Sequence, residues 1–241
     1  MKKIQLLMSA ALVVLLMSCG DDEPNYQIQR DPVDLGLSVK WAPMNIGAAK
    51  PEAMGGLYGW ADSLGLHKPI SDEYPIEVSF RMHEGNEITT VKWNSPYFGG
   101  KSPRANISGS EYDTARHMWN TDWRVPTKEE WQELIDKCDW ELINMDGATG
   151  PVYRVTGPNG NSIIIPLGGI RTTDSYDERG ALGHYWTSNL LLLSEQGAYN
   201  YSSTVACAAW SLTINPHAQD PVVFEPQVRC FSLSYRPVYA K

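Results

Sequence analysis

The chain has 241 residues, of which 42% are hydrophobic and 20% charged, so it carries enough apolar material for a sizeable core. Its formal net charge of −8 gives nucleic acid no basic surface to bind, and it gives an anionic membrane no polybasic segment. We therefore expect neither as a charge-driven partner. Once a leader is removed, the length fits one large domain or two small ones.

The first 18 residues have the order of a secretory leader. Two lysines precede an apolar run, residues 4–17, which is too short to span a bilayer comfortably. The phrase LMSC, residues 16–19, is similar to a bacterial lipobox, in which the peptide is cut before an acylated cysteine. The resemblance implies that residues 1–18 are removed and that Cys19 carries lipid. The alternative is a plain secretory peptide with an incidental cysteine.

Residues 19–32 follow as the lipidated cysteine and a polar tether without hydrophobic periodicity. Their acidic cluster, GDDEP at 20–24, resembles the surface-export signals of some Gram-negative lipoproteins, although a solvated tether has the same composition. We expect an outer-membrane lipoprotein that faces the cell exterior, with the membrane as its partner through the N-terminal lipid.

A single domain is expected over residues 33–241. Its first part, residues 33–47, alternates short apolar stretches with Gly, Asn and Pro, which predicts short strands and turns. Residues 55–110 show no regular period and are rich in turn residues.

Two helices are predicted next. Asp113 is positioned to cap a short helix over residues 114–119. Thr127 and Glu130 have the Thr-x-x-Glu spacing of a capping box at the start of a second helix. The apolar residues of this second helix fall on one stripe that faces a core: Trp131, Leu134, Ile135 and Cys138.

Strands dominate the rest of the chain. Residues 152–167 predict a hairpin, because the turn at 157–160 separates two runs rich in β-branched residues. Further apolar runs lie at 184–193, 205–214 and 222–239. The pattern indicates an α+β domain with two helices and many short strands.

Six phrases occur in one order along the chain: VDLGLSVKWA, GGLYGWAD, EYDTARHMWNTDWRVPTKEEWQELIDKC, VTGPNGNSIIIPLGGIR, HYWTSN and YRPVY. Together they resemble the Fibrobacter succinogenes major paralogous domain of secreted and surface lipoproteins, over most of residues 33–239. That family is similar in fold to C-type lectin-like domains. The resemblance implies two helices packed on a small, mainly antiparallel sheet, termini close together, and long ligand-holding loops on one face. The segment 187–209 departs from the family's pattern because it is longer and more aromatic, and so does the start of the first helix, EYDTA.

Three cysteines remain besides Cys19. If the runs at 205–214 and 222–230 form a hairpin in which Ile214 faces Val222, then Cys207 faces residues 228–230, and a disulfide between Cys207 and Cys230 is geometrically reasonable. The C-type lectin-like resemblance implies instead a bridge from Cys138 to Cys230. Three buried thiols are the third alternative.

The phrase R-x-P-T-x-x-E-W, residues 124–131, also resembles formylglycine-generating enzymes. In those enzymes two closely spaced cysteines near the C-terminus hold copper, whereas Cys207 and Cys230 lie far apart in sequence. The phrase itself has structural content, since Pro126 sets the start of a helix and Thr127 caps it. We therefore expect no catalytic residues.

Two sets of ligand-contact residues are candidates, and no cofactor is expected with either. The turn at 172–180 offers oxygen ligands for calcium, although a solvated acidic turn is the favoured interpretation. These candidates are Asp174, Asp177 and Glu178. Aromatic side chains on loops are suited to stacking on a sugar or peptide surface, although packing in an irregular core is the favoured alternative. These candidates are Trp93, Tyr97, Tyr199 and Tyr201.

The sequence thus predicts a surface-anchored, non-catalytic binding module for a glycan, a host protein or an envelope component. The first alternative is a structural or accessory subunit of a cell-envelope assembly, which an exposed apolar patch at Leu190–Leu193 would favour. An oxidative enzyme is the least favoured class.

Overall fold

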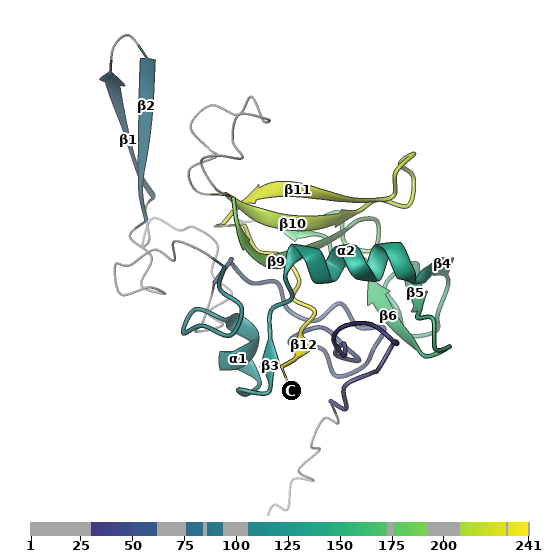
Figure 1. Ribbon diagram of the computed structural model, residues 1–241. Helices are drawn as coiled ribbons and strands as arrows, with labels where there is room; N and C mark the ends of the chain where they lie inside the picture. The colour runs from purple at the N-terminus through teal and green to yellow at the C-terminus, as the bar shows by residue number, and fades with distance from the viewer. Residues whose placement is uncertain are drawn as a thin grey trace, which may run out of the picture.

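Figure 1 shows the computed structural model of the chain. The structure describes residues 30–61, 106–172, 176–191, 208–229 and 231–240, and the backbone alone of 76–83, 86–93 and Tyr176. The chain is mainly β, with two short helices and several small antiparallel sheets. Within these residues, neither helix has the length and apolarity needed to cross a membrane.

In chain order the elements are β1 (Ile76–His83), β2 (Asn86–Trp93), α1 (Thr114–Met118), β3 (Trp123–Arg124), α2 (Lys128–Lys137), β4 (Asp139–Ile143), β5 (Val152–Thr156), β6 (Ser162–Pro166), β7 (Ile170–Arg171), β8 (Tyr176–Asp177), β9 (Gly183–Leu190), β10 (Ala208–Ile214), β11 (Val222–Val228) and β12 (Val238–Tyr239).

Two three-stranded sheets form the framework, with strand orders β11–β10–β9 and β4–β5–β6. The predicted hairpin of β10 and β11 is confirmed, including the pairing of Ile214 with Val222. The predicted β5–β6 hairpin is confirmed as well. The prediction of irregular structure over residues 55–110 is wrong in part, because β1 and β2 pair along their whole length there. β4 was not predicted.

Both helices begin where their capping residues predict. The Asp113 side chain accepts a hydrogen bond from the backbone N–H of Arg116 at α1. Thr127 and Glu130 form a complete capping box at α2. On the predicted stripe of α2, Trp131 and Leu134 are fully buried, whereas the other two residues, Ile135 and Cys138, are half-buried at its margin.

α2 packs against β9 and β10, and its apolar stripe closes one part of the core (Figure 1). The centroid of the Trp131 ring lies 4.7 Å from that of Trp41 and 5.5 Å from that of Tyr185, and all three side chains are buried. Such tilted aromatic pairs stabilise beyond the area that they bury. The helix is therefore held mainly by its packing, since a helix of this length is marginal alone.

A fully buried arginine joins three segments of the fold. The guanidinium of Arg236 donates to the side-chain oxygen of Asn45 at 2.9 Å, to the carbonyl of Ala42 at 3.0 Å and to the carbonyl of Ile164 in β6. Burial lowers the pKa of Arg236 to about 10, so the group still carries its charge at neutral pH. No carboxylate of the described residues pairs with it. Among the described residues, the acceptors that hold this cation are neutral oxygens, and the Tyr185 hydroxyl lies beside it as well.

The two ends of the domain lie side by side, as the family resemblance implies. Trp41 bridges to Val33 on one side and to Val238 of β12 on the other. The predicted strands at residues 33–47 are therefore reduced to isolated bridges. The side chains of Asn159 and Asn161 donate to the carbonyl of Asp34 at 2.9 and 2.8 Å, which fixes this segment on the β5–β6 turn.

Gly157 is required by a close approach at this turn. A Cβ added to Gly157 would lie 2.1 Å from the carbonyl oxygen of Leu35, whereas one added to Gly160, in the same turn, would meet nothing. We expect Gly157→Ala to lower the free energy of unfolding by about 3 kcal/mol, because backbone must shift. Gly160→Ala, whose φ of +86° is strained for alanine, should cost about 1 kcal/mol. Urea unfolding of both variants measures the difference, and equal losses would show that the contact with Leu35 is not tight.

Candidate functional site

A cleft of about 260 Å³ lies where the two ends of the domain meet β3. It is slightly smaller than a typical small-molecule pocket, so it suits one end of a larger ligand. Its lining consists of Asp34, Leu37, Ser38, Val39, Lys40, Arg124, Tyr239 and Ala240.

The lining combines both signs of charge with an aromatic ring. Lys40 and Asp34 are exposed, and one carboxylate oxygen of Asp34 accepts from the backbone N–H of Gly36 at 2.8 Å. Tyr239 packs edge-on against Trp123, with ring centroids 5.3 Å apart. The cleft therefore presents an ammonium donor, carboxylate acceptors and a fixed ring to solvent.

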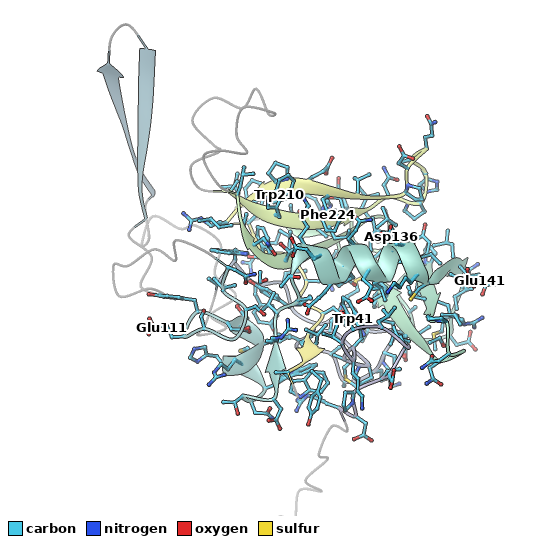
Figure 2. The ribbon with its side chains drawn as sticks, viewed as in Figure 1. Trp41, Glu111, Asp136, Glu141, Trp210 and Phe224 are labelled. Carbon is cyan, nitrogen blue, oxygen red and sulfur yellow. The ribbon has the colours of Figure 1, made fainter. Side chains whose placement is uncertain are left out.

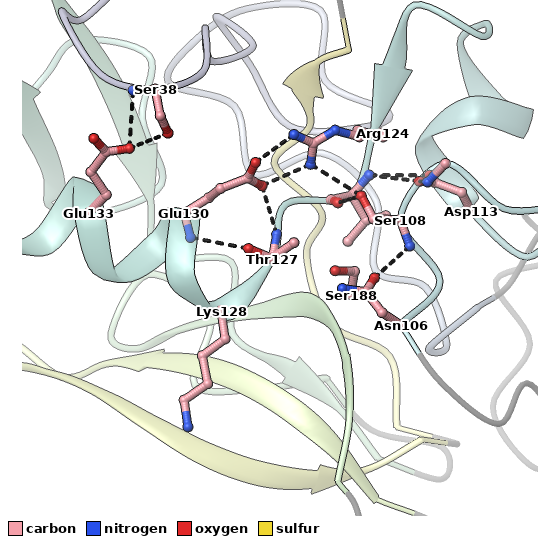
Figure 3. A network of polar contacts seen from close by, with 12 residues as sticks. Ser38, Asn106, Ser108, Asp113, Arg124, Thr127, Lys128, Glu130, Glu133 and Ser188 are labelled. Carbon is pink, nitrogen blue, oxygen red and sulfur yellow. Dashed lines mark hydrogen bonds and ion pairs between the residues drawn. The ribbon is translucent and has the colours of Figure 1, made fainter.

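Glu133 of α2 holds one wall of the cleft. Its carboxylate accepts from both the backbone N–H and the hydroxyl of Ser38 (Figure 3). It also accepts from the ammonium of Lys137 at 2.8 Å. Burial opposes the ionisation of Glu133, but the hydrogen bonds from Lys137 and Ser38 outweigh it, so its pKa is lowered. The carboxylate is ionised at neutral pH, and it orients Ser38 toward the helix.

Arg124 of β3 forms the back of the cleft, and its charge is already paired. The guanidinium binds the carboxylate of Glu130 in a two-pronged arrangement, with an Nη1–Oε2 distance of 2.8 Å, and it donates to the hydroxyl of Ser108 at 3.1 Å. The hydrogen bond to Glu130 raises the pKa of Arg124 further. The same Glu130 oxygen also accepts from the backbone N–H of Thr127 (Figure 3). This fork fixes β3 against the first turn of α2.

Asp113 completes the network on the far side of β3. Its carboxyl is fully buried and accepts from the backbone N–H groups of Gly109, Arg116 and Val125. Burial raises the pKa of Asp113, and these backbone donors oppose that effect without cancelling it. The group thus ties the loop before α1 to the strand that carries Arg124.

Lys128 anchors the first turn of α2 to the sheet β11–β10–β9. Its ammonium nitrogen lies 3.5 Å from the centroid of the Trp210 ring and 5.2 Å from that of Phe224. Figure 2 shows both rings over the N-terminal end of the helix. The backbone N–H of Lys128 donates to the side chain of Asn189 in β9 at 2.9 Å. A cation–π contact of this kind contributes about 1 kcal/mol or more when it is shielded from water.

Most of the predicted site residues lie outside the part of the chain that the structure describes. These are the lipidation residue Cys19, the candidate disulfide cysteines Cys207 and Cys230, the aromatic residues Tyr97, Tyr199 and Tyr201, and the calcium candidate Asp174. Trp93 is the last residue of β2, and only its backbone is described. All these predictions stay predictions. The described part contains a free Cys138, whose pKa is raised by burial, then by Asp139 and Glu133.

The two remaining calcium candidates have other surroundings. Asp177 is exposed at the end of β8, and the carboxylate of Glu178 lies 2.9 Å from Nε2 of the buried His184. In the described segments, no three His, Cys, Asp or Glu side chains gather closely enough to hold a metal ion. Because Asp174 lies outside the described residues, the calcium prediction stays a prediction.

An exposed apolar patch at Leu190–Leu193 would favour the structural alternative, but the described part of this segment is not exposed. Leu190 is half-buried against the core, and Leu191 is buried against Ala208 and Trp210. The other two leucines lie outside the described residues. The two described leucines therefore lend no support to the structural alternative, because they pack within the fold.

Sequence reasoning missed the cleft and the Arg124–Glu130 fork. The one signal for the cleft was that the phrases VDLGLSVKWA and YRPVY, which contribute Lys40 and Tyr239, stand at the two ends of a fold whose termini were expected to meet. The fork had a local signal, since an arginine precedes the capping box by three residues.

Comparison of the chain with family models, with curated proteins and with solved structures finds no match. The family resemblance therefore rests on the phrases of the sequence.

The Arg124–Glu130 fork should contribute measurably to stability. In the Glu130→Gln variant a mostly buried guanidinium loses its carboxylate, so we expect the free energy of unfolding to fall by about 2 kcal/mol. Glu141→Gln is the matched control, because Glu141 pairs with Arg154 at 3.1 Å where both side chains are largely exposed. That change should cost about 0.5 kcal/mol or less. Chemical denaturation of both variants measures the difference, and equal losses would refute a structural role for the fork.

Proposed function

We propose that this chain is a surface-anchored, non-catalytic binding module built on a C-type lectin-like scaffold. The observation that carries the proposal is the cleft beside β3. Its lining combines exposed charged side chains with polar side chains that ion pairs or hydrogen bonds already hold in place. Lys40 and Asp34 are exposed to a ligand. Arg124 and Ser38 are held from behind by Glu130 and Glu133. Such preorganised polar groups bind without a large ordering cost.

A sugar unit of a glycan suits this lining best. Sugars offer hydroxyl groups that both donate and accept, which matches an ammonium group beside carboxylate oxygens. The cleft carries no strong net charge, because Asp34 offsets Lys40 and Glu130 neutralises Arg124. The ring of Tyr239, which lines the cleft, supplies the apolar surface against which a sugar ring can pack. The lipoprotein leader supports exposure of this cleft at the cell surface.

The phrase shared with formylglycine-generating enzymes supports the same proposal. Three of its polar side chains have an architectural partner: Arg124 binds Glu130, Thr127 caps α2, and the Glu130 carboxylate closes the capping box. Trp131 is fully buried in the core. The phrase is thus explained by stability alone, and catalysis is not needed to account for it.

A structural or accessory role in an envelope assembly is the second candidate. It is favoured by Leu142 and Met145, the two large hydrophobic side chains that are exposed in the described part of the chain, at 44% and 38%. Both lie at or just after β4, away from the cleft lining.

Binding to a broad array of glycans and matrix proteins tests the proposed function. A soluble form, residues 21–241, keeps every residue that the structure describes. We expect a saturable glycan signal that is the same with calcium and with a chelator, and that Lys40→Ala weakens at least ~tenfold through loss of a charged donor. Lys50→Ala is the matched control, because Lys50 is equally exposed and lies outside the cleft lining. The absence of any signal from the folded protein would overturn the proposal, as would equal losses in both variants.

A further inference from the structure

β4 is the outer strand of the sheet β4–β5–β6, and no strand of the described residues pairs with its free edge. Unpaired backbone groups on such an edge form a template for another strand. Glu141 of β4 lies at the opposite end of α2 from Trp210 (Figure 2). No residue of β4 lines the cleft, so the edge is a separate surface.

The pairing pattern shows which backbone groups face outward. Gly157 donates to the carbonyl of Asn161 at 2.9 Å, so the odd-numbered residues of β5 bond to β6. Because backbone groups alternate in direction along a strand, the even-numbered residues of β5 bond to β4. In β4 these bonds reach Asp139, Glu141 and Ile143. The N–H and C=O groups of Trp140 and Leu142 therefore point away from the sheet.

The face of this sheet that packs on the core carries an exposed apolar side chain at the free edge of β4. Leu142 lies opposite the buried Tyr153, on the same face as Trp140, whose ring packs edge-on against Tyr153 at 5.6 Å. Even so, Leu142 is 44% exposed. A further strand beside β4 would bury Leu142 and extend the core by one row. The edge thus offers apolar contact as well as hydrogen bonds.

β11, an outer strand of the other three-stranded sheet, is protected where β4 is not. Asn215 donates to the carbonyl of Pro221, and the same alternation makes the backbone groups of Pro226 face outward. Pro226 has no N–H to offer an added strand, and it costs the ladder no bond at that position. The sequence of β4, DWELI, contains neither proline nor lysine. Of these two edges, only β11 therefore carries a proline that removes an outward N–H.

Charge selects the kind of segment that fits. The solvent face of β4 carries Asp139 and Glu141, and Arg154 of β5 already contacts Glu141 from one side. A second copy of the chain that pairs along the full strand would set Glu141 opposite Glu141. A shift of that pairing by two residues toward the start of the strand would set Asp139 opposite Glu141, and both arrangements are destabilising. A strand with basic residues on this face would instead complete the pairing of both acids.

We propose that the free edge of β4 binds an extended segment of a partner protein, in which apolar residues alternate with lysine or arginine. The apolar residues cover Trp140 and Leu142, and the basic residues face Asp139 and Glu141. Strand addition of this type takes its affinity from main-chain hydrogen bonds and its selectivity from alternate side chains. The inference goes beyond the function proposed for the cleft and concerns a different surface, so either can fail alone.

A synthetic peptide of alternating lysine and valine, about eight residues long, is the direct probe. Titration into the soluble form, residues 21–241, should give saturable binding together with slower hydrogen exchange at the amides of Trp140 and Leu142. A peptide with glutamate in place of lysine should bind at least tenfold more weakly. Lys40→Ala in the cleft should leave peptide binding unchanged, which separates this test from that of the proposed function.

Two variants of the edge locate the site. Leu142→Pro removes an outward N–H in the way that Pro226 does in β11, and Glu141→Lys reverses a charge; each should weaken binding at least tenfold. Glu225→Lys is the matched control, because Glu225 is an exposed acid on the protected strand, and it should leave binding unchanged. Circular dichroism checks that each variant is folded.

The proposal is overturned if no peptide binds, if the glutamate peptide binds equally well, or if Leu142→Pro is folded and binds normally. It is also overturned if the protein dimerises through β4, because a second copy would then be the occupant.

Discussion

The burial of one positive charge at Arg236 constrains the whole fold. A guanidinium removed from water is stable only where acceptors surround it, and here they come from Ala42, Asn45 and β6. The chain must therefore bring its N-terminal segment, a sheet and its C-terminal segment to one point. The bridges of Trp41 to Val33 and Val238 follow from that convergence. Because the acceptors are neutral, they hold the cation by geometry, and a small displacement of any segment leaves the charge unsatisfied.

The two proposed binding surfaces lie around this fixed centre. The cleft forms where the joined ends meet β3, and the network from Asp113 through Arg124 to Glu130 keeps β3 against α2. At the other end of α2, the chain turns directly into β4, whose free edge carries the exposed Leu142. The helix thus connects a polar recess to an apolar edge. The rigid packing of Trp131 between them makes the scaffold suited to presenting both surfaces at once.

The parts of the fold that sequence alone could predict are those with local signals. Capping residues located both helices, and turn residues located the β5–β6 hairpin. The β10–β11 hairpin was a hypothesis in which Ile214 faces Val222, and that pairing is observed. The cleft and the Arg236 site join residues from opposite ends of the chain, and the sequence alone does not show which of these residues meet. β4 was missed because it follows α2 directly, although Trp140 and Leu142 alternate with acids as an edge strand does. The lectin-like scaffold and the lipid anchor rest on resemblance and remain proposals.

The buried Arg236 holds three segments of the fold together. The most direct test of this role is amide hydrogen exchange in the Arg236→Lys variant of the soluble form, residues 21–241. A lysine keeps the charge but cannot reach three separate acceptors. The account predicts that the amides of Ala42, Ile46 and Ile165, which lie in different segments, all exchange about a hundred-fold faster, since disrupting a buried charge costs about 3 kcal/mol or more. Faster exchange in one segment alone, or none at all, would contradict it, because the segments would then be held independently of Arg236.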